Sequence, residues 1–100
     1  MAKPNSIDQI IGTWRERQWN NEIVFSIHKL ESNKIAMTHL INNAVINPIA
    51  EFNFSFDAHS QIILQSEIDR YIAWNVDGNF IQIDKDLGRE TYRFNLTKTP

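Results

Sequence analysis

The sequence predicts a small all-β domain, an antiparallel up-and-down meander of about eight strands closed into a barrel. Three observations lead to this prediction. Apolar residues recur at every second position in short segments, and turn residues separate these segments about every 8 to 12 residues. Short connections favour sequential antiparallel neighbours, and closure would remove the two open edges that such a sheet otherwise has.

A short helical turn is expected before the first strand. Ser6 is a suitable N-cap for a turn over residues 6–11, and Gly12 would end it. From the next residue the period changes to two, which places Trp14 on one face of a strand over residues 13–19. We expect this stretch to fix where the first strand starts.

The next two strands are expected over residues 22–30 and 34–41. The pair Asn20 and Asn21 tolerates positive φ and would close the hairpin before them. Residues 42–49 alternate poorly and contain a proline, which bars them from a central ladder position. We expect this segment to form a lid or a crossing at one rim.

The second half of the chain repeats the same pattern. Asp77 and Gly78 indicate a type I′ turn between two strands, and Gly88 is a suitable left-handed turn position. The strands expected here cover residues 51–56, 61–66, 70–76, 79–84 and 90–98.

Alternation assigns one face of each strand to the interior of the barrel. The residues expected to face inward are Trp14, Ile23, Phe25, Ile27, Ile35, Met37, Phe52, Phe54, Phe56, Ile62, Leu64, Ile72, Trp74, Val76, Ile81, Ile83, Tyr92, Phe94 and Leu96. An eight-stranded barrel is just wide enough either to be filled by such side chains or to hold one small ligand. Both alternatives stay open at this point.

Composition excludes several classes of function. The chain has 100 residues with no shift in composition, so we expect one domain over residues 1–100. A net charge of −2 with scattered Lys and Arg argues against a nucleic-acid partner. The absence of cysteine fits a reducing compartment, and no apolar run approaches the length of a membrane span. We expect a soluble, cytoplasmic protein, or a periplasmic one if a leader was removed.

The segment Gly12-Thr13-Trp14 resembles the lipocalin-like (calycin) superfamily, in which a short helical turn precedes Gly-x-Trp at the first strand of a meander. The chain looks closest to compact bacterial lipocalin-like domains. The resemblance implies that Trp14 closes one end of the barrel and that a basic residue near the last strand packs across its indole. Arg89 and Arg93 are the candidates for that basic residue, since guanidinium groups stack well on indole rings.

The resemblance also implies a ligand site inside the barrel. The phase of the first strand carries Glu16 and Gln18 away from Trp14, so we expect this site to open at the opposite rim. Such sites are mostly apolar, with a few polar groups that fix orientation. His39 near Glu16 would make binding sensitive to pH around neutrality. The predicted ligand-binding residues are polar or hydroxyl-bearing at Glu16, Gln18, His39 and Tyr92, and form an apolar wall at Phe25, Met37, Phe54 and Trp74.

Two functional hypotheses follow. The first is non-catalytic binding of a small apolar or amphipathic molecule, with no cofactor, no metal and no enzymatic activity. The second is a solid barrel that acts as a protein-interaction or homo-oligomerisation module. For that second hypothesis the out-of-phase rings Trp19, Tyr71 and Phe80 are the candidates for a homodimer surface. The run from Asp84 to Glu90 has mixed charge and is expected to be a solvated turn.

Overall fold

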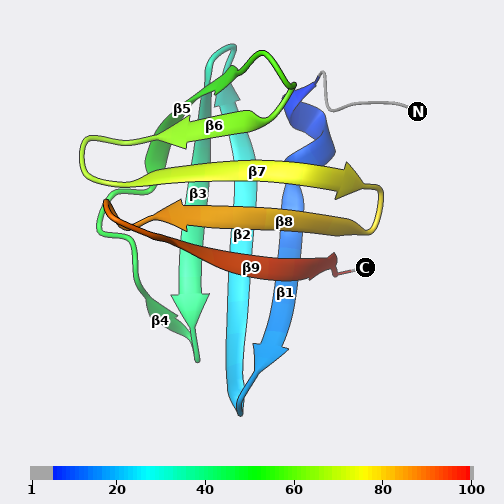
Figure 1. The fold of residues 1–100 in the computed structure, drawn as a ribbon, viewed down its shortest axis with the longest axis vertical. Coiled ribbons are helices and arrows are strands. Elements are labelled where there is room, and N and C mark those ends of the chain that lie inside the picture. The colour runs from blue at the N-terminus through cyan, green and yellow to red at the C-terminus, as the bar shows by residue number, and fades with distance from the viewer. Residues whose placement is uncertain (1–5, 100) are drawn as a thin grey trace.

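A computed structural model describes residues 6–99 of the chain, apart from the side chain of residue 75. Figure 1 shows strands β1, β2 and β3 running along the long axis of the molecule, with β7, β8 and β9 lying across them. The elements in chain order are η1 (Ile7–Ile10), β1 (Gly12–Gln18), β2 (Asn21–Glu31), β3 (Lys34–Ile41), β4 (Ala44–Val45), β5 (Glu51–Phe56), β6 (Ile62–Gln65), β7 (Arg70–Asp77), β8 (Phe80–Asp86) and β9 (Thr91–Lys98).

Within residues 6–99, eight of these strands close an antiparallel barrel. The order around it is β2-β1-β9-β8-β7-β6-β5-β3, and β3 pairs back with β2. The two-residue strand β4 pairs with the end of β3 and lies outside this ring. The predicted all-β meander and its closure are therefore confirmed.

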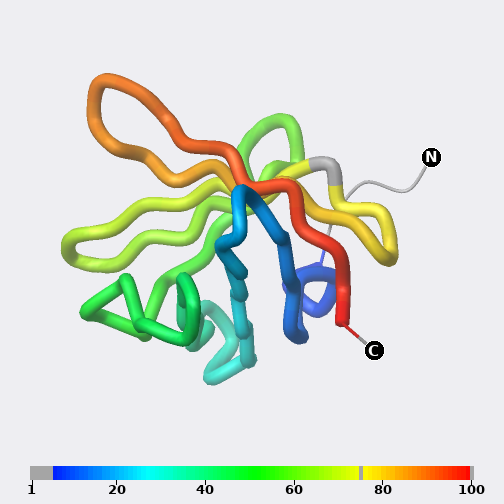
Figure 2. The backbone as a smooth tube through the Cα atoms, turned by 90° about the horizontal axis from the view of Figure 1, so that it is seen from below, coloured from blue at the N-terminus to red at the C-terminus, as the bar shows by residue number. Residues whose placement is uncertain are grey.

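Closure depends on the pairing of the first strand with the last. Trp14 lies opposite Lys98, and Arg15 lies opposite Thr97. The backbone N–H of Thr99 donates to the carbonyl of Thr13 at 2.8 Å, which extends the seam by one hydrogen bond. In Figure 2 the C-terminal end of β9 lies on the opposite side of the molecule from the β8–β9 turn.

Side chains fill the centre of the barrel, which is one of the two alternatives that the sequence left open. On the strands other than β7, most residues predicted to face inward are buried, because alternation holds along those strands. Phe54 is half-buried, and Phe56 and Tyr92 are 39% and 44% exposed. The fully buried side chains include Trp14, Phe25, Ile27, Met37, Phe52 and Tyr71.

The inward face predicted for β7 is wrong over its first half. Tyr71 and Ala73 are buried, whereas Ile72 and Trp74 are on the outer face. The pairing of Ala73 with the buried Ile83 fixes this phase, since directly opposed residues share one face of a sheet. A register shift between Trp74 and Asp77 then breaks the period of two.

The aromatic residues predicted for a homodimer do not share a surface. Tyr71 is fully buried, so its outward placement is wrong. Phe80 pairs with Thr97, next to the Lys98 that faces Trp14. Trp19 instead follows Gln18 at the other end of β1. It is 89% exposed at the tip of the β1–β2 turn.

Two hairpin turns lie one residue away from their predicted positions. Gln18 pairs with Asn21, so the turn residues with positive φ are Trp19 (55°) and Asn20 (70°). Asp77 likewise pairs with Phe80, which leaves Gly78 (φ 42°) as the first turn residue. The pairing register decides the turn position in both hairpins, and composition alone does not report it. Gly88 has φ 92°, as predicted.

Trp14 and the helical turn close one end of the barrel. Ser6 caps η1 by accepting a hydrogen bond from the N–H of Asp8 at 3.2 Å. The carbonyl of Ile10, at the end of η1, accepts a hydrogen bond from Trp14 Nε1 at 2.9 Å. This bond satisfies the only polar atom of a fully buried indole, so the turn and the ring stabilise each other.

The basic residue over the Trp14 indole is Lys98, and the prediction of Arg89 or Arg93 is wrong. Lys98 Nζ lies 5.6 Å from the ring centroid, because the β1–β9 register places Lys98 opposite Trp14. Gly12 has φ 135°, and a Cβ there would lie 3.1 Å from Lys98 Cε. Arg93 stacks instead on Trp74, 4.3 Å from its centroid, and pairs with Asp84 at 3.0 Å.

We expect Trp14→Ala to lower the free energy of unfolding by about 3–5 kcal/mol, because it removes a fully buried aromatic ring from the closed end. Urea unfolding measures the change. Trp19→Ala is the matched control, since that ring is 89% exposed, and it should change stability by no more than about 0.5 kcal/mol. Equal effects of the two substitutions would show that Trp14 does not organise the fold.

Candidate functional site

A hollow of about 300 Å³ lies at the end of the barrel away from Trp14, and we call it the mouth cavity. Its inner surface includes Ile23, His39 and Phe94, which are at most 4% exposed. The outer part includes Ile46, Leu87 and Tyr92, which are 39%, 50% and 44% exposed. The remaining lining residues are Gln18, Asn21, Ile41 and Lys85.

His39 is the most deeply buried polar residue of the mouth cavity, at 1% exposure. Its ring stacks on Phe25 with centroids 4.3 Å apart, and a hydrogen bond of 3.1 Å joins its Nδ1 to the phenolic oxygen of Tyr71. Among the described residues, Nε2 of the same ring is buried and has no hydrogen-bond partner. Burial, aided by the charge of Lys85, lowers the pKa of His39 to about 4, so the imidazole is neutral at pH 7.

Lys85 brings a positive charge to the same cavity. Its side chain is 18% exposed, and its Nζ lies 5.5 Å from the centroid of the Tyr71 ring. Its carboxylate neighbour is Asp69, at 4.0 Å from Nζ to Oδ1. That separation is too long for a hydrogen bond. Burial and the charge of Asp69 raise the pKa of the Tyr71 phenol, which therefore keeps its proton.

The Tyr92 ring and the Gln18 amide form part of the rim. The hydroxyl of Tyr92 donates a 2.6 Å hydrogen bond to Oε1 of Gln18, which ties the start of β9 to the end of β1. The Tyr92 ring lies 4.9 Å from that of Phe94, centroid to centroid. The rim at this point is therefore held by side chains from both strands of the closing seam.

Asn47 fixes the loop that carries Ile46 into the cavity wall. Its Oδ1 accepts from the N–H of His39 at 2.7 Å, and its Nδ2 donates to the carbonyls of Met37 and Ile49 at 2.8 Å each. The side chain is 3% exposed. It supplies hydrogen-bond partners to the backbone of β3 where no neighbouring strand pairs with it. Residues 46–50 thus lie along β3, and the segment predicted to be a lid is attached to the sheet.

The structure brings together Gln18, His39 and Tyr92, three of the predicted site residues. Phe25 lies directly behind His39, and Met37 is buried further toward Trp14 on β3. The Phe25 ring and the Met37 side chain belong to the filled core beneath the cavity.

Three other predicted site residues lie elsewhere. The N–H of Phe54 bonds to the carbonyl of Asn33, at the opposite end of β3 from His39. Trp74 is on the outer face under Arg93, so its predicted place in the wall is wrong. Glu16 is half-buried but does not line the cavity. Burial raises its pKa, partly opposed by a hydrogen bond from the backbone of Asn95.

Sequence reasoning missed Lys85, Leu87 and Ile46 as cavity residues. Lys85 was assigned to a solvated charged turn, yet it continues the inward alternation of Ile81 and Ile83 along β8. This alternation is the sequence signal that places Lys85 on the inward face of the strand. The place of Ile46 follows from the Asn47 contacts, for which the sequence carries no recognisable pattern.

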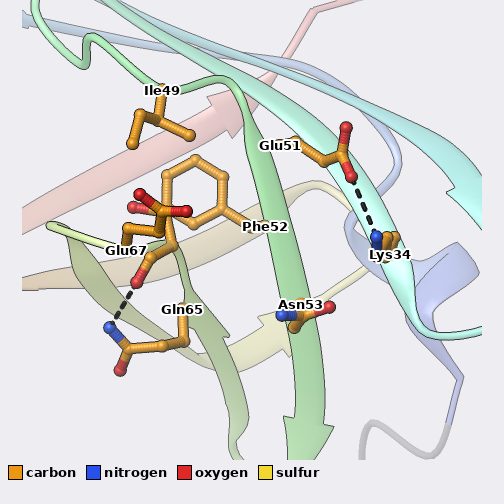
Figure 3. Close-up of a pocket in the computed structure, with 8 residues that line it drawn as sticks. Lys34, Ile49, Glu51, Phe52, Asn53, Gln65 and Glu67 are labelled. Atoms are coloured by element: carbon orange, nitrogen blue, oxygen red, sulfur yellow. Dashed lines mark hydrogen bonds and ion pairs between the residues drawn. The ribbon is translucent and has the colours of Figure 1, made fainter.

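A second hollow, of about 390 Å³, lies where β5 and the end of β6 separate. Figure 3 shows the Phe52 ring between Glu67 on one side and the Lys34–Glu51 pair on the other. Lys34 Nζ lies 3.1 Å from Glu51 Oε1, and Gln65 donates to the carbonyl of Ser66 at 2.9 Å. Since these polar groups already have partners, this hollow is a weaker candidate than the mouth cavity.

The residues described here include no group of three or more His, Asp or Glu side chains arranged to hold a metal ion. Residues 6–99 also contain no helix that is long and apolar enough to span a bilayer. No protein family, curated protein or solved structure compared with this chain matches it. The fold is a closed antiparallel barrel, and the mouth cavity is its strongest candidate for a functional site.

The buried His39 should make stability depend on pH. Its pKa is about 4 in the folded chain and about 6.5 when unfolded, so the unfolded state binds more protons between these values. The contribution of a neutral His39 is complete above pH 6.5 and is lost as the pH falls toward 4. Between pH 7 and pH 4.5 we expect the wild type to lose about 2–3 kcal/mol relative to His39→Phe.

Urea unfolding at both pH values measures this difference, and comparison with the variant cancels other titrating groups, including Glu16. His28→Gln serves as the control for the loss of an exposed histidine. A His39→Phe protein with the same pH dependence as the wild type would show that His39 is not held neutral.

Proposed function

We propose that this chain is a lipocalin-like barrel that binds a small apolar or amphipathic molecule in the mouth cavity, without catalysis. The observation that carries the proposal is a largely apolar hollow lined by His39, a buried residue with one ring nitrogen that has no partner among the described residues. Ile23, Ile41 and Phe94 supply apolar contact, and Nε2 of His39 has no partner among the described residues. Small-molecule sites combine these two features, with apolar walls for affinity and few polar groups for orientation.

Unpaired buried polar atoms support a ligand because they are costly. A buried donor or acceptor without a partner destabilises a fold by about 1–3 kcal/mol, and such atoms are few in native proteins. A ligand that bonds to His39 would recover part of that free energy. We propose binding in preference to catalysis because a histidine with a pKa of about 4 is a weak base at neutral pH.

The filled core limits the size of the ligand. Phe25 and Met37 occupy the interior behind His39, so the molecule would sit in the mouth and not deep in the barrel. A cavity of about 300 Å³ is at the lower end of the range for small-molecule sites. The ligand would therefore be compact, and its outer end would contact Leu87 and Tyr92.

Calorimetric titration with a panel of small apolar and amphipathic compounds tests the proposal. Ile41→Trp should weaken every binding compound by about tenfold or more, because an indole would fill much of the cavity that Ile41 lines. Ile63→Trp is the matched control. Ile63 is also a half-buried isoleucine, but it faces outward between the inward Ile62 and Leu64. Equal loss of binding in both variants, or none in either, would place the ligand elsewhere.

The exposed Trp19 favours a second candidate, a protein contact at the mouth end. A tryptophan with φ 55° is unusual for a bulky residue, and here it holds an 89% exposed ring at a turn tip. If the barrel forms homodimers through this ring, sedimentation should show a dimer that Trp19→Ser dissociates. Phe80→Ser, at the other end of the barrel, should leave that dimer intact. A wild-type protein that stays monomeric at high concentration would refute this candidate.

A further inference from the structure

We propose that the molecule bound in the mouth cavity is a small amphipathic acid whose carboxylate is held by Lys85 and His39. This inference rests on the proposed function and assigns the chemistry of its ligand. Three features of the cavity carry it, namely an ammonium group with no hydrogen bond to the described residues, an imidazole nitrogen that likewise has no partner among them, and a small, mostly apolar volume.

The first feature is the ammonium of Lys85, whose carboxylate neighbour Asp69 lies beyond hydrogen-bond distance. Its three N–H donors make no hydrogen bond within the described part of the chain, although the side chain is only 18% exposed. The carboxylate of Asp69 lies 4.0 Å away and neutralises the charge only in part. Because a largely buried cation is costly without close partners, an anionic acceptor in the cavity would be favoured.

The second feature is the free nitrogen of His39. The hydroxyl of Tyr71 has a single proton, and His39 Nδ1 is its hydrogen-bond partner in the described residues. We therefore assign the hydroxyl as the hydrogen-bond donor and Nδ1 as the acceptor, which places the imidazole proton on Nε2. His39 then presents a second N–H donor, and two donors from β3 and β8 suit the two oxygens of one carboxylate.

The third feature is the apolar remainder of the cavity. Ile23, Ile41, Ile46 and Leu87 are aliphatic, and the polar groups of Gln18 and Tyr92 are hydrogen-bonded to each other. The rest of the ligand should therefore be mainly hydrocarbon. At about 30 Å³ per non-hydrogen atom, the share of one water in the liquid, 300 Å³ holds roughly ten such atoms. Acids of the size of octanoate or 3-phenylpropionate fit this description, and long-chain acids exceed it.

The test compares 3-phenylpropionate with 3-phenylpropionamide, which has nearly the same shape but no charge. By calorimetry at pH 7, the wild type should bind the acid about tenfold or more tightly than the amide, since charge-assisted hydrogen bonds are about twice as strong as neutral ones. Equal affinity for acid and amide would overturn this inference and leave the proposed function standing. If neither compound binds, and octanoate and 1-octanol also fail, both proposals are overturned.

Three substitutions separate recognition from stability, because they are expected to change acid binding in different directions. Lys85→Met should reduce acid binding to the level of the amide, and Lys85→Arg should restore most of the preference for the acid. Asp69→Asn removes the carboxylate that competes for Lys85, so it should tighten acid binding several-fold and leave amide binding unchanged. A general loss of structure would weaken both compounds together. Weaker acid binding in Asp69→Asn, with amide binding intact, would contradict the assigned role of Lys85.

Discussion

The pairing of β1 with β9 is the constraint on which the rest of the structure depends. It joins the two ends of the meander with Trp14 opposite Lys98 and Arg15 opposite Thr97, and it removes both free edges of the sheet. The same pairing decides which end of the barrel is closed. Trp14, bonded to η1 and covered by Lys98, blocks one end, so an opening can form only where β1 finishes at Gln18.

The interior is divided between a filled core and the mouth cavity. Behind His39 the side chains of Phe25, Met37 and Tyr71 leave no exposed surface, which is how a small domain secures enough apolar burial. Toward the mouth the lining changes to partly exposed apolar residues, together with Lys85 and with His39, whose Nε2 is buried without a partner among the described residues. Such groups cost stability, and sites that bind ligands are where that cost is commonly retained.

Much of this fold could be predicted from the sequence, because alternation follows directly from strand geometry. Phe25, Ile35 and Ile83 face inward as expected, and the glycine before Trp14 does mark the start of the first strand. The failures have a common cause in pairing register. The shift after Trp74 and the contact of Lys98 with Trp14 are set by which residues lie opposite each other, and composition does not encode that directly.

The candidate site was harder to predict than the fold. Gln18, His39 and Tyr92 were found because they share the inward phase of long, regular strands. Lys85 was missed because a charged residue near a turn was assumed to be solvated, although its strand carries it inward. The Asn47 contacts that position Ile46 are hydrogen bonds between residues eight to ten positions apart in the sequence. No local sequence pattern predicts them.

We propose that a ligand would occupy the mouth cavity and nothing deeper. The most direct measurement is the change in isoleucine methyl NMR signals as 3-phenylpropionate is added to the wild-type protein. We expect the largest shifts at Ile41, Ile46 and Ile23, with little change at the buried Ile35. The largest shift at Ile49, which lines the groove beside β5, or no shift at any isoleucine, would contradict this account.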